Sequence, residues 1–209
     1  KGLFAAGETA CVSLNGANRL GSNSLTECLV FGARAGRSAA SSASAASDPS
    51  AVRLEELARA EEARIHDTFF GSSGAGERIA DIRADLQQAM EAGAGIYRTE
   101  EELQTACEAV ATLKERYTRV KVDDHSRVFN TQLVATLELG FMLDVAEAVA
   151  NAALRRRESR GSHSRSDYET RDDDNYLKHS LTYQRAGETP HIDYQPVTIT
   201  RWQPEERTY

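Results

Sequence analysis

Residues 13–25 read Ser13-Leu14-Asn15-Gly16-Ala17-Asn18-Arg19-Leu20-Gly21-Ser22-Asn23-Ser24-Leu25. The preceding residues, Gly2–Glu8, are predicted to form a strand. Asn23 or Ser24 is predicted to cap a helix, and Ser24 with Glu27 has the spacing of a capping box. A helix N-terminus suits an anion, and Arg19 adds donors matched to a carboxylate. The pattern predicts an anion or cofactor site at a strand–loop–helix corner. The alternative is a glycine-rich connection with an ordinary cap and a solvated arginine.

Composition excludes several classes of protein. The 209 residues carry 32 acidic and 25 basic side chains, a net charge of −7, which argues against a nucleic-acid surface. No apolar run reaches the about 18 residues that a membrane span needs. Cys11, Cys28 and Cys107 lie far apart with no Cys-x-x-Cys spacing. We therefore predict reduced thiols and no metal site, rather than a zinc site, iron–sulfur ligation or a disulfide framework.

Apolar spacing predicts helices over most of the chain. The helix that begins at residue 23 carries Leu25, Leu29, Val30 and Ala33 on one side and is expected to end near Gly36, followed by a Ser/Ala-rich connection over residues 39–50. Thr99 and Glu102 form a second predicted capping box. Four later stripes predict an antiparallel bundle of three or four helices, with these inward residues: Leu54, Leu57, Ile65 and Phe69; Ile79, Ile82, Leu86 and Met90; Leu103, Cys107, Val110, Leu113 and Tyr117; Leu133, Leu137, Phe141, Val145, Val149 and Ala153.

Charged residues and histidines crowd residues 158–179, after which two short strands are predicted at 181–183 and 197–200. We interpret His163 and His179 as structural histidines. The charged cluster is expected to be an ion-pair network that anchors a small C-terminal unit, with these members: Glu158, Arg160, His163, Arg165, Asp167, Arg171, Asp172 and Asp174.

Several separated motifs resemble, in the same order, the flavoprotein subunit of succinate dehydrogenase and fumarate reductase. They cover nearly the whole chain except residues 39–75. The matching segments are 2–8, 16–25, 30–32, Gly95-Ile96-Tyr97-Arg98-Thr99, Phe129-Asn130-Thr131, Glu158-Ser159-Arg160-Gly161-Ser162-His163-Ser164-Arg165, Arg171-Asp172-Asp173-Asp174-Asn175, Leu177-Lys178-His179 and Ile199-Thr200-Arg201-Trp202.

The resemblance implies a mixed fold. Residues 1–45 would be the terminal strand–loop–helix part of an α/β FAD-binding domain, 46–157 a helical bundle domain, and 158–209 a small α+β C-terminal domain. Family members are about three times as long, and this chain has no Gly-x-Gly-x-x-Gly fingerprint for the dinucleotide. Residues 71–76 have the wrong spacing. We therefore expect the chain to be a fragment or truncated product of a longer flavoprotein, inactive alone.

The resemblance also assigns roles to residues of the first segment. The arginine matching Arg19 binds a carboxylate of the dicarboxylate substrate, the glutamate matching Glu8 contacts the flavin cofactor, and Ser24 and Leu25 match backbone contacts to the flavin ring. Asn15 departs from the family, whose members usually carry His there; this puts substrate affinity or pH response in doubt. Catalytic residues of the family lie upstream, so none is assigned in this chain.

The function implied for the complete protein is the interconversion of succinate and fumarate. Hydride would pass between FAD and the dicarboxylate, and electrons would pass to an iron–sulfur subunit associated with membrane anchor subunits. The implied location is peripheral, on the cytoplasmic face of the inner membrane or the mitochondrial matrix side. Two alternatives remain. The first is L-aspartate oxidase, which shares the Gly-Ala-Asn-Arg and Asn-Ser-Leu segments but resembles this chain less beyond Gly161. The second is a non-catalytic helical interaction module.

Overall fold

The computed structural model describes residues 2–46, 51–71, 76–184 and 187–205. They form two compact units, Lys1–Asp67 and Thr68–Tyr209. The expectation of a mixed, mainly helical fold with small sheets is confirmed. The proposed boundaries after residues 45 and 157 stay predictions. No helix among the described residues combines the length and apolar character that crossing a membrane requires.

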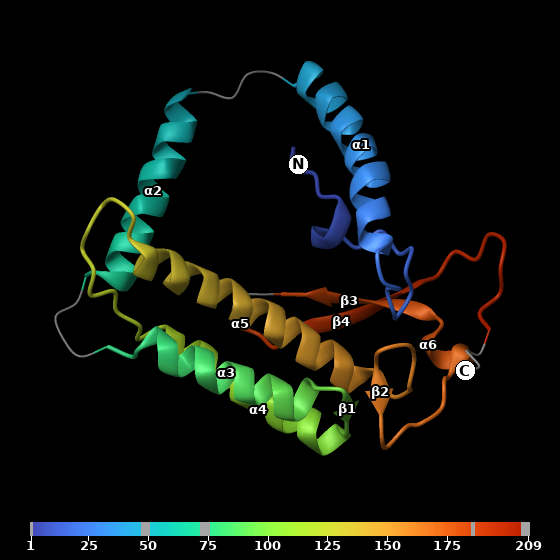
Figure 1. Ribbon diagram of the computed structural model, residues 1–209. Helices are drawn as coiled ribbons and strands as arrows, with labels where there is room; N and C mark the ends of the chain where they lie inside the picture. Colours follow the sequence, from blue (N-terminus) through green and yellow to red (C-terminus); the bar gives the residue numbers. More distant parts are fainter. Residues whose placement is uncertain (1, 47–50, 72–75, 185–186, 206–209) are drawn as a thin grey trace. The chain divides into compact units, whose positions relative to one another are not determined.

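The first unit contains a single 3₁₀ turn, η1 (Gly7–Thr9), the long helix α1 (Asn23–Ser44) and most of α2 (Ala51–Phe69) (Figure 1). The strand predicted at residues 2–8 is wrong, because no β-pairing partner is present for it within the described chain. The predicted end of α1 near Gly36 is also wrong. Residues 37–44 are rich in Ala and Ser, and no proline interrupts them, so the helix continues to Ser44. Residues 47–50 of the predicted connection lie outside the described residues.

The second unit is built on three helices, α3 (Ile79–Ala94), α4 (Glu100–Tyr117) and α5 (Thr131–Arg155) (Figure 1). The end of α3 meets the start of α4 so closely that a Cβ on Gly93 would lie 2.5 Å from the Cβ of Ala106. The hydroxyl of Tyr117 at the end of α4 donates to the carbonyl of Thr136 near the start of α5. Neighbouring helices are therefore antiparallel, as predicted.

The inward-facing residues predicted for α3 and α4 are confirmed, whereas those predicted for α5 are mostly wrong. Ile82 and Leu86, and Leu103, Val110 and Leu113, are buried. On α5 the predicted face is wrong in its middle, since Phe141 is 67% exposed and Val145 and Val149 are also exposed. Leu133 and Leu137 at its start are half-buried, and Ala153 at its end is buried. The buried face instead carries Thr136, Leu139, Leu143, Ala146, Glu147, Ala150 and Ala153. Apolar residues surround much of α5, so spacing alone does not select one face.

Two small sheets complete the second unit. Strands β1 (Tyr97–Arg98) and β2 (Ser164–Arg165) pair in parallel and join the α3–α4 connection to the C-terminal segment. The hairpin of β3 (Lys178–Tyr183) and β4 (His191–Pro196) packs against α5, and the short helix α6 (Asp173–Tyr176) precedes it. The strand predicted at 197–200 lies earlier, at β4, and ends at Pro196.

The stripe predicted for α2 is buried only at its end. Leu54 and Leu57 are exposed, whereas Phe69 is buried and meets Tyr117 edge to face, 5.9 Å between ring centroids. Phe69 belongs to the second unit, and its carbonyl accepts from the amide of Val122 at 3.1 Å. The last turn of α2 therefore completes the core of the second unit.

Candidate functional site

The loop before α1 is shaped by three residues with a left-handed backbone. Ser13, Gly16 and Ser22 have φ values of 63°, 59° and 66°. Ser22, in the N-cap position of α1, makes no side-chain cap hydrogen bond. The predicted capping box of Ser24 and Glu27 is therefore wrong: Ser24 already lies in the first turn, and both side chains bind loop residues instead.

Arg19 lies beside both Ser24 and Glu8. Its Nη1 donates to Oγ of Ser24 at 3.2 Å, and its Nη2 lies 3.6 Å from a carboxylate oxygen of Glu8. The side chain of Arg19 is 43% exposed, so the guanidinium is held from one side and accessible from the other. The structure thus brings together three of the four predicted site residues, and this side chain offers its remaining donors to an anion.

Glu8 lies in η1, where the chain passes against α1. The preceding Gly7 has a φ of 77°, and a Cβ there would lie 2.6 Å from Sγ of Cys28. Only glycine tolerates both the backbone conformation and this close approach. Gly7 therefore sets the position from which Glu8 reaches Arg19.

The fourth predicted residue, Leu25, is exposed on the first turn of α1. Leu29 and Val30 on the same predicted stripe are exposed as well. The role expected for Ser24 and Leu25 involves their backbone groups, which lie at the uncapped end of the helix.

A contact that the motifs did not predict joins Asn15 to Glu27. The amide nitrogen of Asn15 donates to Oε1 of Glu27 at 2.6 Å, and Glu27 is only 5% exposed. Sequence reasoning missed this pair because the residues are separated by 12 positions and Glu27 matched a local capping pattern. One indication of this contact is present in the sequence, namely that Asn15 stands where family members usually carry His.

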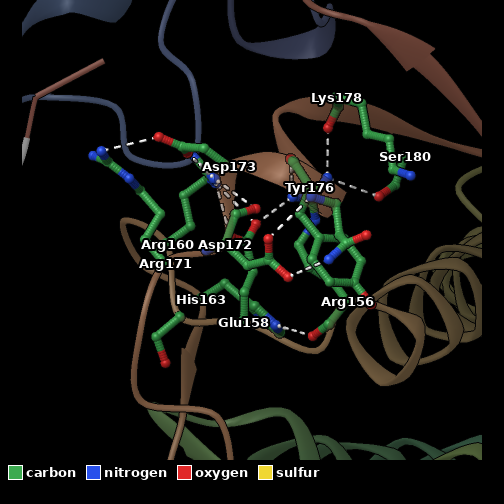
Figure 2. A network of polar contacts seen from close by, with 12 residues as sticks. Arg156, Glu158, Arg160, His163, Arg171, Asp172, Asp173, Tyr176, Lys178 and Ser180 are labelled. Carbon is green, nitrogen blue, oxygen red and sulfur yellow. Dashed lines mark hydrogen bonds and ion pairs between the residues drawn. The ribbon is translucent and has the colours of Figure 1, made fainter.

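The charged cluster after residue 157 forms an ion-pair network, as predicted (Figure 2). One predicted member is wrong: Asp173, and not Asp174, pairs with Arg160 and Arg171. At its centre is Glu158, fully buried, which accepts from Arg156 at 2.5 Å and from Arg160 at 2.8 Å. Burial raises the pKa of Glu158, but the hydrogen bonds from Arg160, from the amide of Asp172 and from Arg156 outweigh it, and the pKa lies below its usual value. The carboxylate is therefore a structural anion.

The network holds the C-terminal hairpin to the end of α5. Arg156 also donates to the carbonyls of Tyr176 and Lys178 and to the hydroxyl of Ser180 (Figure 2). Arg160 reaches Asp173 at 2.5 Å. These contacts join α5, α6 and β3, so they are structural, as the sequence predicted.

His163 is held between two polar partners. Its Nδ1 lies 2.9 Å from Nη1 of Arg98, and its Nε2 lies 2.9 Å from the carbonyl of Arg156. An arginine can only donate, so Nδ1 accepts and Nε2 carries the proton. Burial lowers the pKa of His163; the hydrogen bond to the carbonyl opposes this shift, and the charges of Arg98, Arg165 and Arg156 reinforce it. His163 is thus a neutral structural histidine, as predicted.

The cysteines show no assembled site in the described part of the chain. Cys11 and Cys28 are exposed free thiols, and Cys107 is half-buried in α4. Burial raises the pKa of the Cys107 thiol, which Glu108 and Glu147 raise further. Across residues 2–46, 51–71, 76–184 and 187–205, no three His, Cys, Asp or Glu side chains gather as metal ligands would.

Comparison with protein families gives two matches. Residues 83–209 match the family described as fumarate reductase flavoprotein C-term, and residues 1–25 match an FAD binding domain. The first match begins at Arg83 within α3 and covers the rest of the helical bundle and the C-terminal network. The second covers Glu8, Arg19, Ser24 and Leu25.

Known relatives agree with these matches. The chain is 54% identical to the fumarate reductase flavoprotein subunit of Mycobacterium tuberculosis, over 100% of this chain and 36% of that protein. It is 46% identical to the Escherichia coli subunit, over 100% and 35%. A solved E. coli quinol fumarate reductase structure has a TM-score of 0.91 at 45% identity, covering 99% of this chain and 35% of that one.

The chain spans about a third of the length of these relatives. An adenylylsulfate reductase of Archaeoglobus fulgidus, at 22% identity and a TM-score of 0.57, shares the fold alone. The family match extends over 127 consecutive residues to position 209, beyond Gly161, where L-aspartate oxidases were expected to diverge. The chain therefore belongs to the family of fumarate reductase flavoprotein subunits.

Proposed function

We propose that the complete flavoprotein interconverts succinate and fumarate, with FAD as its cofactor. The observation that carries this proposal is the position of Arg19, which lies against Glu8 and Ser24 beside the N-terminus of α1. The family membership supports it, because the relatives are fumarate reductase flavoprotein subunits.

Arg19 would bind one carboxylate of the four-carbon dicarboxylate. A guanidinium stays charged at any working pH and can donate two parallel hydrogen bonds to a carboxylate. Ser24 and Glu8 hold it from one side, so little side-chain freedom is lost when the substrate binds. Negative charge that develops on the substrate during fumarate reduction would be stabilised by the same cation.

The residues at the start of α1 fit a flavin. The helix begins without a side-chain cap and with no acidic residue in its first turn. The amide of Leu25 donates to the carbonyl of Ser22 at 3.1 Å. The partial positive charge of the helix end would face an electron-rich ring edge, with the backbone of Ser24 and Leu25 and the side chain of Glu8 in contact with the flavin. When bound, FAD supplies the hydride acceptor and donor at its N5 atom. Glu8, Ser24 and Leu25 would orient that group, and Arg19 would place the dicarboxylate beside it.

We further propose the arrangement of the complete protein. Residues 1–45 would close the FAD-binding domain, residues 46–157 would form a helical domain, and residues 158–209 a small C-terminal domain. Electrons would pass to an iron–sulfur subunit held by membrane anchor subunits, with the flavoprotein peripheral on the cytoplasmic face of the inner membrane or on the matrix side. A solved relative is a quinol-fumarate reductase with menaquinol molecules, which supports such an assembly.

The test replaces Arg19 in the complete flavoprotein. Arg19→Ala should lower fumarate reduction by about 10²-fold or more, since an electrostatic contact to the reacting group is lost, while flavin stays bound. Arg34→Ala, an exposed arginine on the same helix, is the matched control and should leave turnover unchanged. Retention of turnover within a few-fold in Arg19→Ala would contradict the assignment. Oxidation of L-aspartate by the wild-type protein, without fumarate reduction, would favour the aspartate oxidase alternative.

A second measurement concerns the 209-residue chain alone. The purified chain should show no flavin absorbance, because the dinucleotide fingerprint is absent from its sequence. The comparison is the complete flavoprotein purified in the same way, which should be yellow. Tightly bound flavin in the 209-residue chain would contradict this expectation and would show that residues 1–45 suffice for the cofactor.

A further inference from the structure

Two buried polar side chains on α1 hold the two ends of the loop that carries Arg19. Ser24 accepts from Arg19 at 3.2 Å, and Glu27 accepts from Asn15 at 2.6 Å. Ser24 and Glu27 are three residues apart, so they lie on the same side of the helix, and they are the only residues of α1 that are buried. The buried face of this helix is thus polar and is used to bind the loop.

We propose that Glu27 is a positioning residue for substrate binding, which acts through the side-chain amide of Asn15 to hold residues 15–19 in place. This inference rests on the proposed function, because it concerns where Arg19 stands when the dicarboxylate arrives. Nothing in the family resemblance assigned a role to Glu27.

The burial of Glu27 is the first argument. A carboxylate removed from water is costly unless its oxygens are hydrogen-bonded, and an apolar residue at a buried helix position would avoid that cost. Glu27 places an oxygen 2.6 Å from the Asn15 amide, 12 residues away in sequence. The side chain is therefore suited to binding the loop, and less suited to packing.

The exposure of the loop is the second argument. Gly16, Ala17, Asn18 and Arg19 are exposed, and a Cβ at Gly16 would have nothing within 4 Å. Gly16 also adopts a φ of 59°. Because glycine has no side chain, the backbone at this position is free to adopt other conformations. Since apolar packing within the described residues contributes little here, the hydrogen bonds of Asn15 and Arg19 help to orient the segment. Loss of the Asn15–Glu27 bond would release the end of the segment opposite to Arg19.

The experiment uses the complete flavoprotein with bound FAD and measures fumarate reduction per bound flavin. Glu27→Leu removes the acceptor and should raise KM for fumarate about tenfold while kcat stays within about twofold, because Arg19 is still present but less ordered. Glu27→Gln keeps a carbonyl oxygen that can accept from Asn15 and should stay near the wild-type KM. Thr26→Val, at an exposed neighbour, is the control and should change neither constant.

A double-mutant cycle separates this role from a general loss of stability. Asn15→Leu should raise KM as Glu27→Leu does, and the double variant should be no worse than either single one. Effects that multiply would overturn the proposal, as would an unchanged KM in both single variants. A fall in kcat and bound flavin without a change in KM would also overturn it, since that is the result of a merely structural residue.

A readout independent of turnover is amide hydrogen exchange over residues 15–19. Exchange should accelerate in Asn15→Leu and in Glu27→Leu and remain at the wild-type rate in Glu27→Gln. Asn15→Leu, in a half-buried loop position, covers the case in which Glu27→Leu fails to fold. If the wild-type protein shows no fumarate turnover, the proposed function fails, and the inference about Glu27 is then decided by exchange alone. Unchanged exchange in both leucine variants overturns it.

Discussion

The guanidinium of Arg165 and the carboxylate of Asp167 form a two-bond ion pair, with both N–O distances 2.7 Å. The side chain of Arg165 is fully buried and also donates to three carbonyls at the end of α5, those of Ala153, Leu154 and Arg156. Asp167 in turn accepts from the amide of Glu100 in the first turn of α4. The pair therefore links the negative end of one helix to the positive end of another, where each charge is favoured.

The first prediction concerns this pair. Asp167→Asn should lower the free energy of unfolding by about 3 kcal/mol, because a buried guanidinium loses its counter-charge. Asp174→Asn, at an exposed position of α6, is the control and should have little effect. The measurement is urea denaturation of the 209-residue chain at neutral pH. Equal stability of the two variants would show that the three carbonyls alone satisfy Arg165.

The second prediction is a pH dependence of stability caused by His163. Burial and the neighbouring arginines lower the pKa of His163 from its ordinary value of 6.5. The unfolded chain therefore binds a proton more readily than the folded one. The contribution of His163 to stability should be complete above about pH 6.5 and be lost as pH falls from there through the folded pKa. Urea denaturation of wild type and His163→Gln between pH 7.5 and 5 checks this. A constant difference between them across that range would count against the prediction.

The third prediction concerns acid. The hydrogen bond and charge of Arg165, with the amide of Glu100, lower the pKa of Asp167 from 3.8 to about 2, although burial opposes them. A lowered pKa means stability that is present above about pH 3.8 and lost as pH falls toward 2. Asp167→Asn should therefore show a shallower loss of stability than wild type between pH 4 and 2. A parallel loss in both proteins would assign acid unfolding to other carboxylates.

The fourth prediction tests the capping box at the start of α4. The hydroxyl of Thr99 accepts from the amide of Glu102, and the Glu102 carboxylate accepts from the amide of Thr99. Thr99→Ala should cost about 1 kcal/mol of unfolding free energy. Thr105→Ala, exposed in the middle of the same helix, should cost less than about 0.5 kcal/mol. Thermal unfolding compares the two, and a larger loss in Thr105→Ala would refute the assignment.

The fifth prediction separates the two faces of α5. Leu139→Ala should cost about 3 kcal/mol, because the side chain is fully buried and leaves a cavity. Phe141→Ser should cost less than about 0.5 kcal/mol in the 209-residue chain, since Phe141 is mostly exposed. Denaturation midpoints of the two variants decide between this arrangement and the face expected from spacing. A larger loss of stability in Phe141→Ser than in Leu139→Ala would show that the face of Phe141 is the buried one.

Local signals predicted local features well. Two features depend on neighbours a few positions away, so the sequence determined them. They are the capping box of Thr99 and Glu102 and the inward residues of α3 and α4. The ordered family motifs determined which family the chain belongs to. They also pointed to Arg19, which the structure places beside Glu8 and Ser24.

Tertiary structure decided the features that depend on distant partners. The strand expected at residues 2–8 has no partner to pair with in the described chain, and α5 buries the face of Leu139 because α3 and α4 lie there. Ser24 and Glu27 match a capping box in sequence, yet they bind Arg19 and Asn15. A buried polar side chain needs a hydrogen-bond partner, and the folded loop supplies both partners. Periodicity shows which residues share a side, but contact with the rest of the fold decides which side is inside.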